Sequence, residues 1–184
     1  MLGRDQEIMR NSIRFAAAAL AVVSFGSAAN AATTATGTAT AEVLSTLTVT
    51  PDADLRFGQL AANGGGTVVI PADSSAAITT TGTLVSTGTR GAAHFTVAGN
   101  RGVGVNLTAL SVTTPLTWQG TWGGPGAAPT MPLSALTSRW DNNVDVLDAT
   151  TGLAGFNVGG TLTVAAAQEP GVYSGTFSVS VEYR

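Results

Sequence analysis

The last fourteen residues, Gly171 to Arg184, alternate strictly between apolar and polar side chains. The apolar positions share one parity and include Tyr173, Phe177, Val179, Val181 and Tyr183. A period of two is typical of a β-strand with one apolar face, so a closing strand is predicted here. Because this strand finishes the chain, we expect its partners to lie earlier in the sequence and its far edge to lack a partner from the same chain.

A second alternating stretch covers residues 38–50 and is comparable in length. Its apolar positions are Ala39, Ala41, Val43, Leu47 and Val49, with threonine and glutamate on the opposite parity. This pattern predicts a long first strand. The segment Pro51-Asp52-Ala53-Asp54 predicts a turn that ends the strand, because proline cannot donate to a ladder and aspartate favours turns.

Shorter apolar stretches separated by turn residues fill the middle of the chain. The pair Asn63-Gly64 precedes the apolar run 67–70 and predicts a tight hairpin turn. Residues 92–97 and 103–107 each keep their apolar side chains on one parity, and the Gly/Asn turn between them predicts a second hairpin. The sequence therefore predicts an all-β fold, namely an antiparallel β-sandwich with Greek-key connections.

The N-terminal residues have the layout of a secretory signal peptide. The apolar run 15–28 follows Arg10 and Arg14, precedes a small-x-small site that ends at Ala31, and is too short to span a bilayer. We expect residues 1–31 to be removed, with Met9 as an alternative start. This leaves no transmembrane segment, with 32–50 as an N-terminal extension or first strand and 51–184 as the sandwich domain.

Composition narrows the classes of function. The chain has a net charge of −3, no cysteine and a single histidine, and its arginines are scattered. No disulfide, zinc–thiolate site or basic patch for nucleic acid is predicted. His94 falls on the polar face of its strand, where we expect it to be solvated. With no nucleophile–base pair and no G-x-S-x-G elbow, the sequence indicates neither an enzyme nor a cofactor.

Two side-chain groups remain as candidate binding sites. Trp118 and Trp122 lie in a Pro/Gly-rich stretch and either close one end of the sandwich or form an exposed platform for a glycan or peptide. Asp141, Asp145 and Asp148 form an acidic cluster whose oxygens suit calcium, but the spacing is not that of a calcium-binding loop. An edge strand with an acidic outer face explains the same aspartates.

Both ends of the expected mature chain resemble known secreted domains. Residues 38–58 (TATAEVLSTLTVTPDADLRFG) and 171–184 (GVYSGTFSVSVEYR) resemble the ends of subunits of archaic chaperone–usher pili and of spore-coat-U-like domains. With residues 159–164 (GGTLTV), they resemble more closely a Cys-free family of secreted bacterial domains of unknown function that is regarded as pilin-like. The resemblance covers residues 32–58 and 159–184, and the chain lacks the cysteines of many archaic pilins.

The pilin resemblance implies a structural function. In such subunits an immunoglobulin-like (Greek-key) β-sandwich lacks its last strand, and a periplasmic chaperone covers the gap. The N-terminal extension of the next subunit later fills the gap at an outer-membrane usher. Carried over, the acceptor groove is lined by Phe177, Val179 and Val181. The donor side chains are Ala39, Ala41, Val43, Leu47 and Val49, the last two either continuing the donor or starting the first strand.

The expected function is thus a fimbrial or pilus-type subunit that passes through the periplasm to the cell surface and binds other copies by strand addition. The alternative is a self-complemented monomeric surface or extracellular domain in which residues 36–50 pair within their own chain. In that case Trp118 and Trp122 are the candidate glycan-binding residues.

Overall fold

The computed structural model describes residues 36–184, and the predicted signal peptide lies outside them. Within this range, a compact unit runs from Glu42 to Arg184 and is separate from the residues up to Ala41. No helix among the described residues combines the length and apolar character needed to cross a membrane.

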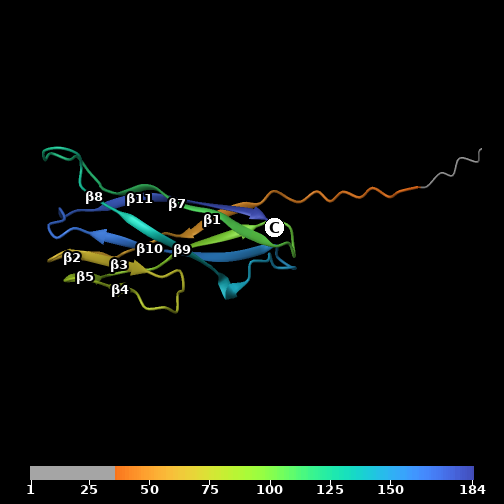
Figure 1. Cartoon of the computed structure of the whole chain (residues 1–184), viewed down its shortest axis with the longest axis horizontal. Coiled ribbons are helices and arrows are strands. Elements are labelled where there is room, and N and C mark those ends of the chain that lie inside the picture. Colours follow the sequence, from red (N-terminus) through yellow and green to blue (C-terminus); the bar gives the residue numbers. More distant parts are fainter. Residues whose placement is uncertain (1–35) are drawn as a thin grey trace, which may run out of the picture. The chain divides into compact units, whose positions relative to one another are not determined.

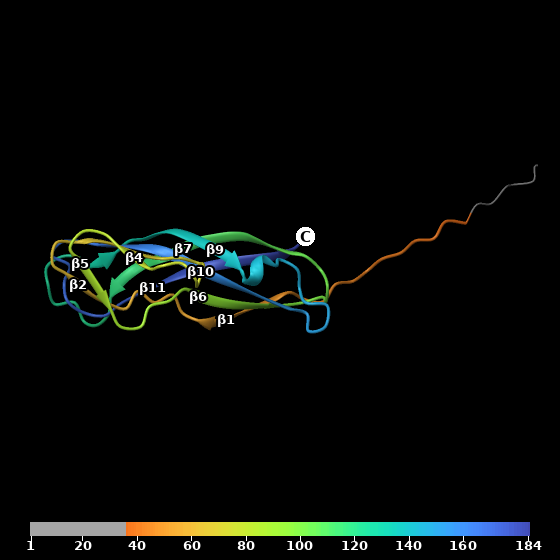
Figure 2. The ribbon, with the colours of Figure 1, turned by 90° about the horizontal axis from the view of Figure 1, so that it is seen from below.

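The compact unit is built almost entirely of antiparallel strands, which confirms the predicted all-β sandwich class (Figures 1 and 2). The strands are β1 (Thr48–Ala53), β2 (Gln59–Ala62), β3 (Gly66–Ile70), β4 (Thr79–Thr80), β5 (Leu84–Thr87), β6 (Ala93–Ala98), β7 (Val105–Trp118), β8 (Thr130–Met131), β9 (Leu133–Trp140), β10 (Leu153–Val164) and β11 (Tyr173–Tyr183). One 3-10 turn, η1 (Asp141–Asn143), follows β9.

Strand β10 is the centre of the larger sheet. One side of it pairs first with β6 and then with β3, and its other side pairs with β9. The sheet has the order β1-β6-β10-β3-β4, with β9 off this path. The second sheet has the order β11-β7-β8, and β2 pairs with β5 in a small third sheet.

The core fills the space between the sheets as two apolar clusters. The first contains Phe57, Val68, Ile70, Leu84, Met131, Leu133, Leu162 and Val164. The second contains Ala93, Val97, Val105, Leu147, Phe156 and Val158. Phe156 is 1% exposed and packs against Phe95 and Trp140 at centroid distances of 5.2 and 5.0 Å, so β10 supplies the centre of the second cluster.

The predicted hairpin turn at Asn63-Gly64 is wrong, because the chain bends there instead of reversing. β2 continues into β3, and β4 continues into β5. Because β2 pairs with β5 and β3 pairs with β4, the four strands form one long hairpin that bends in the middle. Gly66 has φ 154°, and a side chain there would overlap with the carbonyl oxygen of Thr81. The glycines therefore allow two stretches of chain to change sheet together, which local turn statistics cannot distinguish from a reversal.

The predicted hairpin between residues 92–97 and 103–107 is also wrong. β6 joins the larger sheet and β7 the second one, so the connection crosses between the sheets. Its ends are held by the backbone N–H groups of Gly99 and Gly102, which donate to the carbonyl oxygens of Gly152 and Leu147 at 3.0 and 2.9 Å. Each strand buries an apolar face against the opposite sheet, and the alternating pattern is the same for either pairing.

The first strand is shorter than predicted and includes its proline. β1 begins only at Thr48, and residues 36–47 are not in a strand. It continues through Pro51, where a turn was predicted, with an irregular register between Pro51 and Ala53. A strand needs a neighbour for its backbone groups, and an edge strand tolerates a proline that cannot donate.

Candidate functional site

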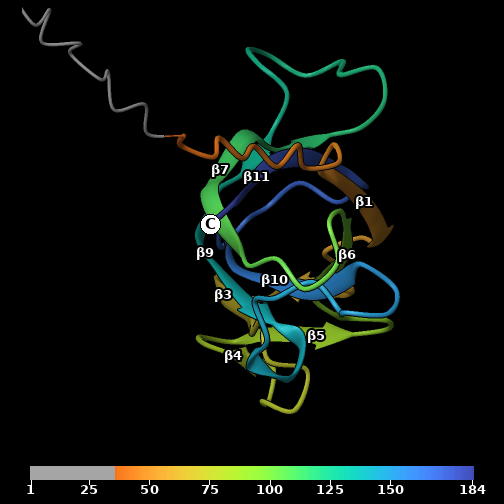
Figure 3. The same ribbon diagram turned by 90° about the vertical axis from the view of Figure 1, so that its right-hand side faces the viewer.

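Two strands at one side of the sandwich have an unpaired edge. β1 pairs only with β6, and β11 pairs only with β7, so within residues 36–184 no strand pairs with the outer edge of either. In the end-on view β1 and β11 lie next to each other without joining (Figure 3). The two sheets are therefore open along this side, and unpaired backbone N–H and C=O groups line the opening.

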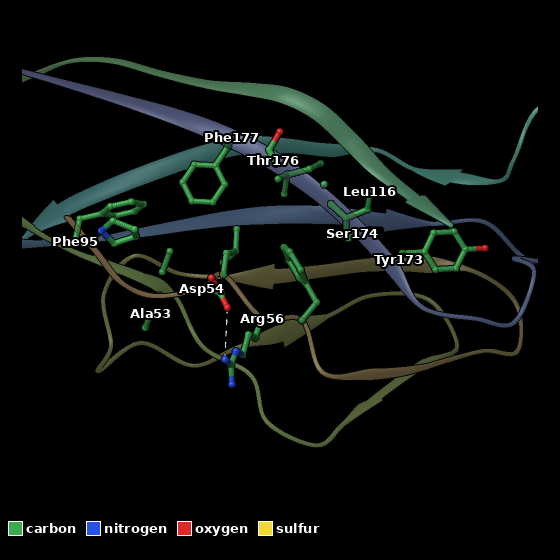
Figure 4. Close-up of a pocket in the computed structure, with 15 residues that line it drawn as sticks. Ala53, Asp54, Arg56, Phe95, Leu116, Tyr173, Ser174, Thr176 and Phe177 are labelled. Carbon is green, nitrogen blue, oxygen red and sulfur yellow. Dashed lines mark hydrogen bonds and ion pairs between the residues drawn. The ribbon is translucent and has the colours of Figure 1, made fainter. Parts of the chain in front are cut away.

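A cavity of about 550 Å³ lies between the end of β1 and the start of β11 (Figure 4). Phe177 projects into it from β11 and meets Phe95 of β6 edge-on, with ring centroids 5.9 Å apart. Its further apolar lining is Leu55, Phe57, Ala93, Leu116, Leu133 and Tyr173. Several of these side chains belong to the core clusters, so the cavity borders directly on the core.

A second cavity, of about 900 Å³, shares Leu55, Phe57, Leu116 and Tyr173 with the first. It continues toward β2 and the turn before β11, and adds the core side chains Met131, Leu162 and Val164. We call the two cavities together with the open edges of β1 and β11 the edge groove.

The three predicted groove residues share one face of β11. Phe177, Val179 and Val181 pack against the second core cluster, but all three are only half-buried. Phe177 also lines the first cavity, whereas the two valines lie further along the same edge. The apolar face of β11 thus remains partly exposed, although hydrophobic burial is the main favourable term in folding.

The five predicted donor residues fall into two groups. Val49 lies in β1 opposite Val97, and Leu47 packs against the second core cluster just before it, so both are in the position of a first strand. Ala39, Ala41 and Val43 are exposed and outside any strand, and Val43 is 92% exposed.

The base of this N-terminal segment is fixed at the far end of β11. The Tyr183 hydroxyl donates to the carbonyl oxygen of Ser45 at 2.9 Å and accepts the N–H of Asn100 at 2.7 Å. The amide side chain of Asn100 in turn accepts the N–H of Ser45 at 3.3 Å. β1 therefore starts where β11 ends, and the first cavity lies at the opposite end of β11.

A polar cluster around the histidine was not found from the sequence. The Nδ1 atom of His94 lies 2.8 Å from Oδ2 of Asp52, and its Nε2 atom lies 3.0 Å from Oδ2 of Asp141. Thr96 donates to the first carboxylate at 2.7 Å, and Asn157 donates to the second at 2.8 Å. His94 was expected to be solvated, but its side chain is only 33% exposed between two carboxylates. Asp52 lies 42 positions before His94 and Asp141 lies 47 positions after it, and no sequence signal pairs residues that far apart.

The two carboxylates change the protonation of the imidazole. The hydrogen bond to Asp141 and then that to Asp52 raise the pKa of His94, while partial burial opposes the shift. The hydrogen bond from Thr96 is the largest effect that lowers the pKa of Asp52. A neutral imidazole has one N–H, so only the imidazolium can donate to both carboxylates.

The two candidate tryptophans pack on each other at the end of β7. The ring centroids of Trp118 and Trp122 lie 5.7 Å apart at 68°, and Trp118 Nε1 donates to the carbonyl oxygen of Pro170 at 3.1 Å. Both indoles are half-buried outside the two core clusters. Side chains added at Gly124 or Gly171 would overlap with the rings, so glycine backbone covers part of their surface.

The three candidate metal ligands have separate partners. Asp141 belongs to the cluster around the histidine, Asp145 pairs with Arg184 at 2.6 Å, and Asp148 accepts the N–H of Thr151 at 2.7 Å. Among residues 36–184 no group of three or more His, Asp or Glu side chains is arranged to hold a metal ion. Each aspartate is explained by a local hydrogen bond or ion pair.

Comparison with known proteins gave one family. A family model described as a domain of unknown function (DUF4402) matches residues 47–183, which include both walls of the edge groove and His94. The search of curated proteins gave no match, and neither did the search of solved structures. The expectation of a domain family without an assigned function is confirmed, while the pilin-like resemblance stays a prediction. The chain belongs to the DUF4402 family of domains of unknown function.

Proposed function

We propose that the protein is an exported structural subunit that assembles by β-strand addition, with the edge groove as the acceptor. The observation that supports this most is the opening between β1 and β11, where two unpaired strand edges flank a cavity that reaches the core. An added strand would pair with these edges and cover the half-exposed face of β11. Its backbone hydrogen bonds would contribute about 0.5–1.5 kcal/mol each.

We propose that the donor is the exposed N-terminal segment of a second copy, residues 36–44. This segment leaves the domain at the Tyr183 end, whereas the first cavity lies at the Tyr173 end. If copies stack head to tail in the same orientation, the donor enters the next groove antiparallel to β11. Such an interface does not close on itself and generates a filament. Return into its own groove would need a reversal before Ser45 and would make the donor parallel to β11.

Side-chain size favours a donor that is antiparallel to β11. Val43 is the only large side chain on the donor face of this segment, and the other positions on that face are alanine or glycine. In the antiparallel direction Val43 reaches the wide cavity beside Gly175, and the small residues lie against Phe177 and Val179. Burying the valine is worth about 1.5–3 kcal/mol, whereas the parallel direction would place alanine or glycine in the cavity.

The proposal includes export after removal of residues 1–31, transit through the periplasm and display at the cell surface. A groove with unpaired strand edges and half-buried apolar side chains is prone to aggregation, which favours a periplasmic chaperone and an outer-membrane usher as transient partners. The protein has no catalytic role in this proposal.

A synthetic peptide of residues 36–47 tests the acceptor role. Added to the purified exported chain, it should raise the melting temperature in a concentration-dependent manner. A peptide with Val43→Asp should have no effect, whereas Thr40→Asp, on the outward face, should leave the effect intact. A monodisperse monomer whose melting temperature none of the peptides changes would instead support completion within one chain.

Engineered disulfides test the direction, because the chain has no cysteine of its own. The pair Glu42→Cys with Thr176→Cys should give disulfide-linked oligomers if the donor is antiparallel and comes from a second copy. The matched pair Glu42→Cys with Ser180→Cys uses another outward position on β11 and should give few. The reverse result, with cross-links inside one chain, would contradict donation between copies.

A further inference from the structure

We propose that His94 controls the edge groove by holding β1, which forms one of its walls, and that strand binding is tightest when the imidazole carries both protons. The inference rests on the proposed acceptor role of the groove. It concerns a side-chain cluster on the sheet surface beside the groove and none of the residues that would contact the donor.

The first step is the way in which the end of β1 is attached. The register with β6 shifts between Pro51 and Ala53, so Asp52 has no partner residue across the ladder. Pro51 also has no N–H to donate. At this point the carboxylate of Asp52 bonds instead to His94 Nδ1 at 2.8 Å and to Thr96 Oγ1 at 2.7 Å. Side-chain bonds therefore replace backbone pairing where β1 borders the cavity.

The second step is the anchor on the other side of the ring. His94 Nε2 faces Asp141 of η1 at 3.0 Å, and Asn157 of β10 donates to the same carboxylate at 2.8 Å. The ring thus connects β1 across β6 to β10 and η1. We call this chain of contacts the histidine strut.

The third step is the requirement for both ring protons. The charged groups that face the imidazole are the two carboxylates, from β1 and from η1. The nearest cation on β9, Arg139, lies opposite Asn157 but is bound to Asp73 and Asn143. Once the ring loses a proton, one nitrogen turns a lone pair toward a carboxylate, and one of the two bonds is lost. The same contacts raise the pKa of His94.

The fourth step links the strut to binding. Pro51, Ala53 and Asp54, on both sides of Asp52, line the first cavity. A wall that is already fixed binds an added strand more tightly than one that becomes ordered on binding. Deprotonation should therefore weaken donor binding by about two- to five-fold, the range of one partly exposed ion pair.

The single histidine makes the test direct, because all imidazole NMR signals of the chain come from one residue. Its titration in the exported chain should give a pKa above 6.5, and Asp52→Asn and Asp141→Asn should each lower that pKa. A labelled peptide of residues 36–47 should bind about two- to five-fold more weakly at about pH 8.5 than at about pH 5.5. His94→Gln, which cannot titrate, should bind with the same affinity at both pH values.

The outcomes separate this inference from the proposed function. Peptide binding that is equal at both pH values in the wild type would overturn the strut but keep the acceptor groove. If the peptide binds at neither pH, the acceptor role fails, and hydrogen exchange decides on the strut. Protection factors of the β1 amides that donate to β6 should then fall with rising pH relative to those of β7. Unchanged protection of β1 would overturn the inference.

Discussion

The hydroxyl of Tyr183 donates a 2.9 Å hydrogen bond to the backbone carbonyl of Ser45, which lies 138 residues earlier in the chain. The contact ties the end of the last strand to the base of the N-terminal segment. It also fixes the end of the domain from which that segment leaves, and this decides whether the same chain can reach its own groove without a reversal.

Replacing Tyr183 with Phe should weaken the attachment of the N-terminal segment to the end of β11. The change removes the bond to Ser45 and leaves the N–H of Asn100 without its acceptor, so the free energy of unfolding should fall by about 1–2 kcal/mol in urea. Limited proteolysis should also cut residues 42–47 faster. Tyr173→Phe removes hydroxyl contacts to Gln168 and Glu169 at the other end of β11 and serves as the control. Equal cleavage in both variants would contradict the idea that the Tyr183–Ser45 hydrogen bond restrains this segment.

Two phenylalanines on opposite sides of the core should respond differently to truncation. Phe156→Ala removes a side chain that is 1% exposed and should destabilise the chain by about 3–5 kcal/mol. Phe177→Ala removes a half-buried side chain from the edge groove and should cost less than about 2 kcal/mol in the free chain. Its larger effect should be on binding of the peptide 36–47, measured by fluorescence anisotropy. Equal losses of stability would mean that the groove is already closed.

Substitution of Gly155 should break the histidine strut without replacing any of the residues that form it. A methyl group at Gly155 would overlap with Oδ2 of Asp141 and come within 3.0 Å of His94 Nε2. Gly155→Ala should therefore lower the free energy of unfolding by about 1–3 kcal/mol and lower the NMR pKa of the histidine. Gly123→Ala, at a position with no neighbour within 4 Å, should change stability by less than about 0.5 kcal/mol. An unchanged pKa in the first variant would argue against the His94–Asp141 contact.

The stabilisation from His94 should depend on pH in a defined way. Because the folded state raises the pKa of His94, its contribution is fully present below the unfolded value of 6.5 and is lost as the pH rises through the folded value. The pKa of Asp52 is lowered, so its contribution is present above 3.8 and is lost as the pH falls. The difference in unfolding free energy between wild type and His94→Gln, from urea titrations, should be largest between pH 3.8 and pH 6.5. A difference that is constant with pH would exclude the ion pairs as its source.

The alternating patterns determined the strands at the C-terminus and the all-β class. The apolar face predicted for β11, with Phe177, Val179 and Val181, is the face that meets the core in the structure. A period of two is a local property of an extended backbone, and it appears whichever strand lies alongside. The far edge of β11 was predicted to be unpaired because of the place of this strand in the sequence, and among residues 36–184 β7 is the one strand that pairs with it.

Pairing, by contrast, was decided by the tertiary structure. The same pattern that made residues 92–97 and 103–107 look like a hairpin also fits two strands in opposite sheets, and burial between the sheets selected the second arrangement. The histidine strut depends on Asp52, His94 and Asp141 meeting across neighbouring elements. The sequence alone determined which side chains each strand turns inward, because that is local. Only packing between the sheets decided which strands are neighbours, which edges stay open and which distant charges meet, because these depend on contacts remote in sequence.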